Sequence, residues 1–173
     1  MRMNKAISAT ALFALVLWGS TVVAPLLRAQ DANPIENRTT VAAISDDSMQ
    51  QMLDNMGYEP KRLGKGYLIS IKRDSWTYNM QILLSPDKTK IGFNANLGSV
   101  ENPDSITAAQ WKNLLISNGE IDPSFFFFDK ESKKLYLHRV LDNRGINAAF
   151  LRQQIENFCG NIKETGDLWK FTK

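Results

Sequence analysis

The sequence predicts an α+β domain, with an antiparallel sheet of about five strands and helices packed mainly on one face. Three apolar stripes at helical spacing each follow a residue that can cap a helix, and five apolar runs alternate with period two. These runs stand in groups of three and two between the helical stripes, which gives the element order α-β-β-β-α-β-β-α. Strands grouped in this way between single helices are typical of α+β folds.

Each predicted helix begins at a side chain that can accept a hydrogen bond from the first free N–H groups, and each ends at a glycine. The second helix also contains a capping box, because Gln110 follows Thr107 at the third helical position. Helices of about three turns are marginal in isolation, so burial of the apolar stripe has to stabilise each one. The predicted caps and stops are Ser45 with Gly57, Thr107 with Gly119, and Asn147 with Gly160.

The predicted strands show the alternation of a sheet with one buried and one wetter face. Short turn-like links join the first three strands, so we expect an antiparallel meander. A charged loop over residues 129–133 joins the last two strands. The predicted strands are 67–72, 76–84, 90–97, 125–128 and 135–140.

The N-terminal residues 1–29 are predicted to be an export signal. Arg2 and Lys5 precede an uncharged run over residues 6–27, and a basic start before an apolar run is typical of secretory signals. We therefore expect an exported protein, periplasmic or secreted. The alternative is an uncleaved membrane anchor, because the run over 6–27 is long enough to span an apolar bilayer core of ~30 Å. Residues 30–44 are predicted to be a flexible linker, 45–160 the α+β domain and 161–173 a C-terminal tail.

Composition and charge exclude several classes of protein. The 173 residues are 43% hydrophobic and 10% aromatic, which suits one globular domain and excludes a disordered chain. The net charge of +3 comes entirely from the export signal, which holds Arg2, Lys5 and Arg28 and no acidic residue. The remainder is neutral, so we expect no nucleic-acid partner. A local basic cluster is interpreted as a solvated face: Lys61, Arg62, Lys65, Lys72 and Arg73.

No catalytic, metal or cofactor site is predicted. A single Cys and a single His exclude a disulfide framework and a zinc site built from such ligands within one chain. The sequence contains no nucleophile elbow, phosphate-binding loop or dinucleotide fingerprint. A strand histidine without a partner, here His138, is more often a packing residue than a base, and Cys159 is interpreted as a structural thiol.

The run Phe125-Phe126-Phe127-Phe128 is the feature that most needs explaining. In a strand, two of these rings point to each face of the sheet. If Phe125 and Phe127 join the core under the helices, then Phe126 and Phe128 lie on the outer face. The expected binding residues on that face are Phe126, Phe128, Tyr136, His138 and Val140.

An outer patch of this kind would expose several hundred Å² of apolar surface, about the most that a soluble monomer tolerates. We therefore expect it to be a homodimer interface or a groove for a protein or peptide partner. The alternative is that the apolar residues of the C-terminal tail fold back over it. Those residues are Ile162, Leu168, Trp169 and Phe171.

The element order and several short segments resemble the type III secretion chaperone-like fold, which includes the bacterial YbjN-like proteins. The resemblance spans about residues 45–160 and is carried by Met52-Leu53-Asp54-Asn55-Met56-Gly57-Tyr58, Phe127-Phe128-Asp129, Leu135-Tyr136-Leu137-His138-Arg139 and Asp142-Asn143-Arg144-Gly145. It implies a small, often dimeric, non-enzymatic domain that binds protein segments. Secretion chaperones of this shape act in the cytoplasm and are typically acidic, so delivery of effectors is not expected of an exported, neutral domain.

Two other functions remain as alternatives. A small envelope hydrolase would have to use Asp142, Arg144 and His138, the only visible polar cluster. A polysaccharide- or lipid-binding module could use Trp76 and Tyr78, although their even spacing with Met80 favours a place in the core.

Overall fold

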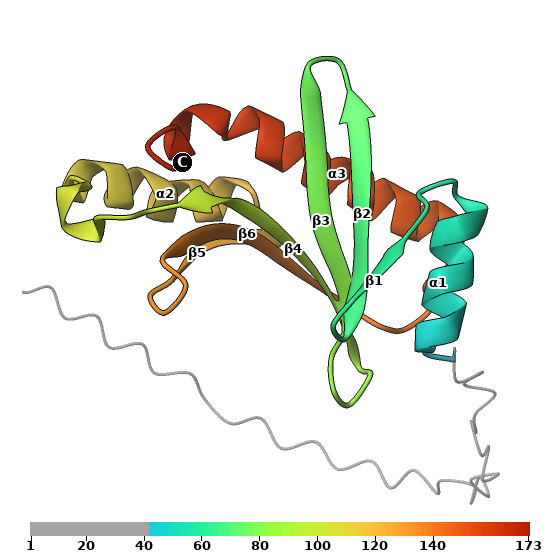
Figure 1. Ribbon diagram of the computed structural model, residues 1–173. Helices are drawn as coiled ribbons and strands as arrows, with labels where there is room; N and C mark the ends of the chain where they lie inside the picture. The colour runs from blue at the N-terminus through green and yellow to red at the C-terminus, as the bar shows by residue number, and fades with distance from the viewer. Residues whose placement is uncertain (1–41) are drawn as a thin grey trace, which may run out of the picture. The chain divides into compact units, whose positions relative to one another are not determined.

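The computed structural model describes residues 42–173, and the predicted export signal and most of the predicted linker lie outside this range (Figure 1). The described part is an α+β domain, as predicted, and its antiparallel sheet has six strands, close to the five expected. None of its helices is both long enough and apolar enough to cross a membrane. The main elements are α1 (Asp46–Asn55), β1 (Lys61–Leu63), β2 (Gly66–Arg73), β3 (Trp76–Leu84), β4 (Lys90–Ser99), α2 (Ala108–Glu120), β5 (Ser124–Asp129), β6 (Lys134–Asp142) and α3 (Ala148–Glu164); short 3₁₀ turns cover Pro103–Ser105 and Gly166–Trp169.

All neighbouring strands of the sheet are antiparallel, in the order β1-β2-β3-β4-β6-β5. The predicted meander corresponds to β2, β3 and β4, and β6 joins the sheet beside β4. The edge strand β1 was not predicted, because Lys61-Arg62-Leu63 is too short to show an alternating pattern. The two edges of the sheet are therefore β1 and the phenylalanine-rich β5.

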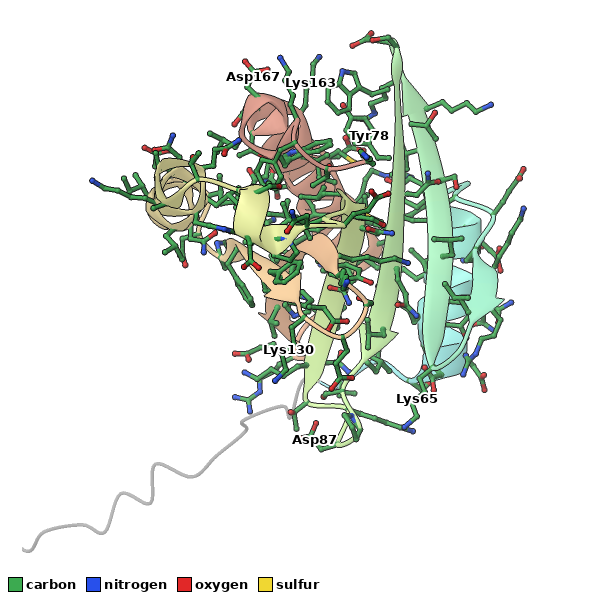
Figure 2. All side chains as sticks on the ribbon, turned by 60° about the vertical axis from the view of Figure 1, so that its left-hand side comes forward. Lys65, Tyr78, Asp87, Lys130, Lys163 and Asp167 are labelled. Atoms are coloured by element: carbon green, nitrogen blue, oxygen red, sulfur yellow. The ribbon has the colours of Figure 1, made fainter. Side chains whose placement is uncertain are left out.

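The three helices lie on one face of the sheet, which we call the inner face. From α1, the backbone carbonyl of Asp46 accepts a hydrogen bond from the hydroxyl of Tyr67 on β2. From α3, the ring of Phe158 packs on that of Phe93 of β4, with centroids 5.8 Å apart. Figure 1 shows α3 running behind β2 and β3, and Figure 2 shows Tyr78 pointing from β3 toward α3. The sheet thus has one covered face and one face without a helix among the described residues.

The phase of the β5 alternation is the reverse of the one expected. Phe126 is buried and Phe128 packs against the core, whereas Phe125 and Phe127 are 39% and 36% exposed on the outer face. Ser124 explains this phase, because its hydroxyl accepts hydrogen bonds from Arg139 and Asn161 on the inner side at 2.9 and 3.0 Å. With Ser124 turned inward, strand alternation also turns Phe126 and Phe128 inward.

The helix starts agree with the sequence better than the helix ends. Ser45, Thr107 and Asn147 cap the three helices, and the capping box of Thr107 and Gln110 is present. Gly57, with φ of +81°, directly follows the C-cap of α1 as expected. The predicted stops at Gly119 and Gly160 are wrong, because α2 continues to Glu120 and α3 to Glu164. A helical glycine costs only about 1 kcal/mol, which burial of Ile162 in the next turn of α3 can offset.

The C-terminal tail packs on the inner face. The ring of Phe171 lies 6.0 Å from that of Trp111 on α2, and the ring of Trp169 lies 6.2 Å from that of Trp76. The backbone of Lys173 exchanges two hydrogen bonds with Ser99, at 2.8 and 3.0 Å. The alternative in which the tail covers the outer face is therefore wrong.

Asn143 joins three parts of the chain, and its loss should be costly. It is 3% exposed; its Oδ1 accepts from the N–H of Ile44, and its Nδ2 donates to the carbonyls of Ile44 and Lys88. Asn143→Ala leaves these three partly buried groups without their partner, so we expect the free energy of unfolding to fall by about 2–3 kcal/mol. Urea denaturation measures this loss, with Asn113→Ala on the exposed side of α2 as control. Equal midpoints for the two variants would contradict the assigned role of Asn143.

Candidate functional site

The outer face of the sheet carries three kinds of side chain in neighbouring bands. Directly paired residues of antiparallel strands point to the same face, so the strand register places these side chains. One row crosses all six strands, and it consists of Phe125, His138, Asn94, Gln81, Leu68 and Lys61. We call Phe125, Phe127, Tyr136 and His138 the aromatic cluster, Asn79, Gln81, Asn94 and Asn96 the amide band, and Leu63 and Leu68 the aliphatic end.

The aromatic cluster is a set of rings in mutual contact across β5 and β6. Phe127 and Tyr136 are stacked, with centroids 5.1 Å apart and planes 11° from parallel. The imidazole of His138 meets Phe125 and Phe127 edge to face, at 5.2 and 6.0 Å. Edge-to-face and stacked contacts of this kind hold the rings in defined orientations. The cluster is therefore an ordered apolar surface rather than four independent rings.

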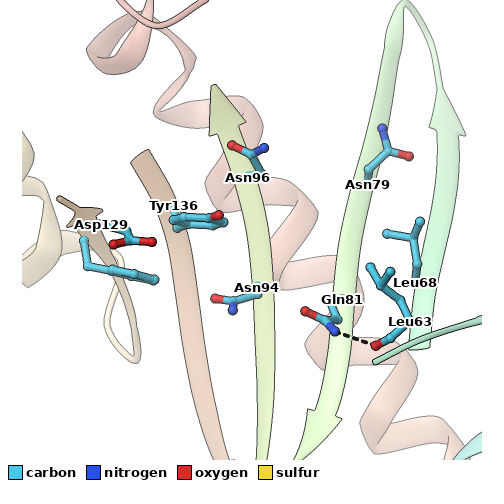
Figure 3. Close-up of a pocket in the computed structure, with 9 residues that line it drawn as sticks. Leu63, Leu68, Asn79, Gln81, Asn94, Asn96, Asp129 and Tyr136 are labelled. Atoms are coloured by element: carbon cyan, nitrogen blue, oxygen red, sulfur yellow. Dashed lines mark hydrogen bonds between the residues drawn. The ribbon is translucent and has the colours of Figure 1, made fainter. Parts of the chain in front are cut away.

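A groove of about 570 Å³ runs from the aromatic cluster across the amide band to the aliphatic end (Figure 3). Its walls include Tyr136 and Asp129 at one end and Leu63 and Leu68 at the other. Figure 3 shows the amide band between these ends, together with the hydrogen bond of 2.9 Å from Nε2 of Gln81 to the carbonyl of Leu63. The groove crosses the strands and does not follow them.

Within the amide band, existing hydrogen bonds use most of the side-chain oxygens, so the groups left free to bind a ligand in the groove are mainly N–H donors. The Oδ1 atoms of Asn79, Asn94 and Asn96 accept from Ser70 Oγ, His138 Nδ1 and the N–H of Gly98, at 2.6, 2.8 and 3.0 Å. Their Nδ2 groups form no hydrogen bond with the described residues. Three N–H₂ groups can therefore donate to a ligand, and Gln81, whose nitrogen is used, offers its Oε1 as acceptor.

The charged groups around the groove differ between its two ends. Lys61 and Lys72 belong to the outer side of β1 and β2, and neither forms an ion pair with another described residue. At the other end, hydrogen bonds from the Ser132 hydroxyl and the Glu131 N–H lower the pKa of Asp129. Asp129 is paired across β5 and β6 with Lys134, so the charges at the aromatic cluster offset each other, whereas Lys61 beside Leu68 gives the aliphatic end a positive charge.

His138 titrates within the aromatic cluster, and its pKa can be measured directly. Burial among the rings lowers this pKa below its ordinary value of 6.5. Because the unfolded chain then binds protons more tightly than the folded one, stability should fall as the pH drops below about 6.5. His138 is the only histidine of the chain. One NMR titration therefore reports its midpoint, which we expect below 6.5.

The variant His138→Gln serves as control for this pH dependence. The stability of this variant should not fall between neutral pH and about pH 5. Carboxylates with a lowered pKa, such as Asp87 with a pKa of about 2, affect stability only at more acidic pH. A His138 titration midpoint at or above 6.5, or a pH profile of stability that is the same in His138→Gln as in the wild type, would contradict the placement of the ring.

The structure brings together only some of the expected binding residues. Tyr136, His138 and Val140 lie on the outer face, and Val140 is 37% exposed. Phe126 and Phe128 face the helices instead, and Phe125 and Phe127 take the expected place beside Tyr136.

The residues of the two alternative functions do not form a site. Asp142 pairs with Lys90 and lies four residues along β6 from His138, or about 13 Å, so the pair is not in contact. Tyr78 is buried and stacks on Trp76 at 5.9 Å, so both belong to the core side of the sheet. Among residues 42–173, no three His, Cys, Asp or Glu side chains are grouped so that they could hold a metal ion.

A second, mainly apolar groove of about 390 Å³ lies between α2 and β5. Trp111 and Leu115 line it from the helix, and Phe126, Phe127 and Phe128 line it from the strand. Leu115 is 70% exposed and the adjacent Ile116 is 53% exposed. The sequence pattern did not predict this surface, because the adjacent Leu114 and Leu115 are equally apolar although Leu114 is buried and Leu115 is exposed.

Solved structures share this fold. YbjN from E. coli matches with a TM-score of 0.54 at 19% identity, over 73% of this chain and 96% of that one. A chain of the ExsC-ExsE complex matches with a TM-score of 0.53 at 14% identity, over 72% and 95%. A chain of the HopA1-SchA chaperone-effector complex gives a TM-score of 0.47 at 9% identity, over 73% and 89%. No protein-family model and no curated protein matches the sequence. The first two of these structures show that the chain has the YbjN-like, type III secretion chaperone-like fold that its sequence resembles.

Proposed function

We propose that this domain is a non-catalytic protein-binding module whose outer sheet face takes up a segment of polypeptide. The observation that carries the proposal is the groove of about 570 Å³ on a face that no other described element covers, with an ordered aromatic cluster at one end. Aromatic side chains in such a position are typical anchors for a partner's apolar side chain. The fold adds support, because the similar ExsC structure is a complex with ExsE.

The amide band suits a polypeptide backbone. Every residue of a bound segment other than proline offers one carbonyl acceptor and one N–H donor. The free Nδ2 groups of Asn79, Asn94 and Asn96 can donate to such carbonyls, and Oε1 of Gln81 can accept from an N–H. A segment bound here would satisfy these groups without depending on one particular sequence.

A selection from a random 12-residue peptide library tests the proposal. The target is the protein in the form that its own cell produces. The double variant Phe127→Ser/Tyr136→Ser is the counter-target, which removes peptides that bind elsewhere. We expect enriched peptides that bind the wild type and not the double variant by fluorescence anisotropy. Leu115→Ser, an exposed change outside this groove, is the matched control and should bind as the wild type does. Absence of enrichment, or binding of oligosaccharides alone, would overturn the proposal.

The second groove favours self-association as a further candidate function. An exposed Leu115 and Ile116 beside an apolar groove are typical of an interface between copies. The edge of β5 is partly blocked against strand pairing, because Oδ1 of Asn118 accepts from the N–H of Phe126 at 2.7 Å. Because strand pairing at this edge is disfavoured, we expect two copies of the chain to contact each other through α2. Analytical ultracentrifugation should show a dimer that Leu115→Glu/Ile116→Glu dissociates and Asn113→Glu does not; a wild-type monomer at 100 μM would contradict this candidate.

We also propose that the chain is exported, because residues 6–27 form an uncharged apolar run after two basic residues. Cell fractionation and N-terminal sequencing test this. We expect a shortened chain in the envelope or medium, and Arg2→Glu/Lys5→Glu should reduce its amount. A full-length chain in the soluble cytosolic fraction would contradict export.

A further inference from the structure

We propose that the bound segment crosses the strands and carries a defined pattern: an apolar side chain at one point and, four to seven residues away, an aliphatic residue next to acidic ones. The apolar side chain packs on the aromatic cluster, and the aliphatic and acidic residues meet the edge formed by β1 and β2. This inference rests on the proposed function and adds the chemistry of the partner.

The direction follows from the row of paired residues that spans the sheet. Phe125 and His138 begin the row, Asn94 and Gln81 continue it, and Leu68 and Lys61 end it. Asn94, Gln81 and Leu68 of this row line the groove, which reaches the aromatic cluster at Phe127 and Tyr136. A segment that fills the groove therefore crosses the strands.

The spacing follows from sheet geometry. Neighbouring strands lie about 4.8 Å apart, so β6 and β2 are separated by about 14 Å and β5 and β1 by about 24 Å. An extended chain advances about 3.3 Å per residue. A segment that packs on both Tyr136 and Leu68 therefore has its two anchors about four positions apart in its sequence, and one that reaches from Phe127 to Leu63 has them about seven positions apart.

The preference for acidic residues follows from charge and hydrogen-bond donors at the far end. Lys61 and Lys72 form no ion pair among residues 42–173, and both belong to the outer side of the sheet. Lys61 is paired directly with Leu68, whereas Lys72 lies four residues further along β2, about 13 Å from Leu68. The Nδ2 of Asn79 is a further donor on this side of the groove. At the other end, Asp129 is paired across β5 and β6 with Lys134, so their opposite charges offset each other and give acidic residues no net attraction there. The positive charge of Lys61 thus favours the acidic part of the pattern at the aliphatic end of the groove.

Four labelled peptides test the pattern against the protein as its cell produces it. Two contain Phe-Ser-Gly-Ser-Leu-Glu-Glu and its reversed order, since an extended chain can cross in either direction, and two have Lys in place of Glu. At low salt we expect one acidic peptide to bind about tenfold more tightly than its lysine counterpart, with most of the difference lost in 0.5 M salt. In Lys61→Glu/Lys72→Glu the preference should invert, whereas Lys112→Glu on α2 should leave it unchanged. All three substituted sites are exposed, and a thermal unfolding curve verifies that each variant folds.

The outcomes separate this inference from the proposed function. Equal binding of both charge forms, or an acidic preference that survives Lys61→Glu/Lys72→Glu, overturns the inference while library-selected peptides still support the proposed function. If neither these peptides nor selected ones bind, both fail. Competition by a chitin-derived tetrasaccharide that depends on Phe127 would assign the groove to a glycan and would likewise overturn the inference.

Discussion

Replacing Phe127 and Tyr136 together by serine is expected to weaken peptide binding more than a hundredfold while the domain stays folded. The two rings are stacked at the end of the outer groove, and aromatic anchors of this kind typically contribute 2 kcal/mol or more each to binding. The folded state loses much less, because Phe127 is 36% exposed and the stacked pair itself contributes only about 0.5–1.5 kcal/mol. Fluorescence anisotropy with a selected peptide measures the binding, and urea denaturation measures the stability.

The neighbouring residue provides the matched control for this prediction. Phe126→Ser changes the same residue type one position earlier, but Phe126 is 7% exposed and faces α2. It should lower the free energy of unfolding by about 3 kcal/mol or more. A double variant that binds like the wild type, or a Phe127→Ser protein less stable than Phe126→Ser, would contradict the assignment of the two faces.

Phe158→Ala should have the largest effect on stability, a loss of about 3–5 kcal/mol. Phe158 is fully buried in α3 and packs on Phe93 at the centre of the sheet, with centroids 5.8 Å apart. Native domains are stable by about 5–15 kcal/mol in total, so this substitution should bring the protein close to unfolding. The reason is the cavity left between α3 and β4, which the well-packed inner face cannot fill by relaxation.

Phe150→Ala on the same helix is the control for Phe158→Ala. Phe150 is 38% exposed in the first turn of α3, so its loss should cost less than about 1 kcal/mol. Urea denaturation of both variants gives the comparison. Similar losses for the two would contradict the assignment of Phe158 to the centre of the core.

The sequence predicts the elements of this fold well, because helix caps and strand alternation are local signals. Ser45, Thr107 and Asn147 act as caps where expected, and the alternation of β3 coincides with its burial. The ends of α2 and α3 depend instead on tertiary contacts, such as the hydrogen bond from Asn161 to the carbonyl of Ile121. Glycine alone therefore did not mark them.

The candidate site is predictable only in part. Four consecutive phenylalanines have no polar residue between them to set the phase, and the phase depends on Ser124, Arg139 and Asn161, which are far apart in the sequence. The amide band is absent from the sequence prediction for another reason. Asn79, Asn94 and Asn96 read as the ordinary wet face of a sheet, and only the register places them side by side between two apolar ends.

We expect the outer face of the sheet, and not the groove at α2, to receive the polypeptide. The side-chain NH₂ signals in a ¹H–¹⁵N spectrum test it most directly, since each groove contains asparagine side chains. On addition of a selected peptide, we expect the signals of Asn94 and Asn96 to shift while that of Asn118 stays in place. A shift of the Asn118 signal with those of Asn94 and Asn96 unchanged would place the peptide in the groove at α2 and contradict binding on the outer face.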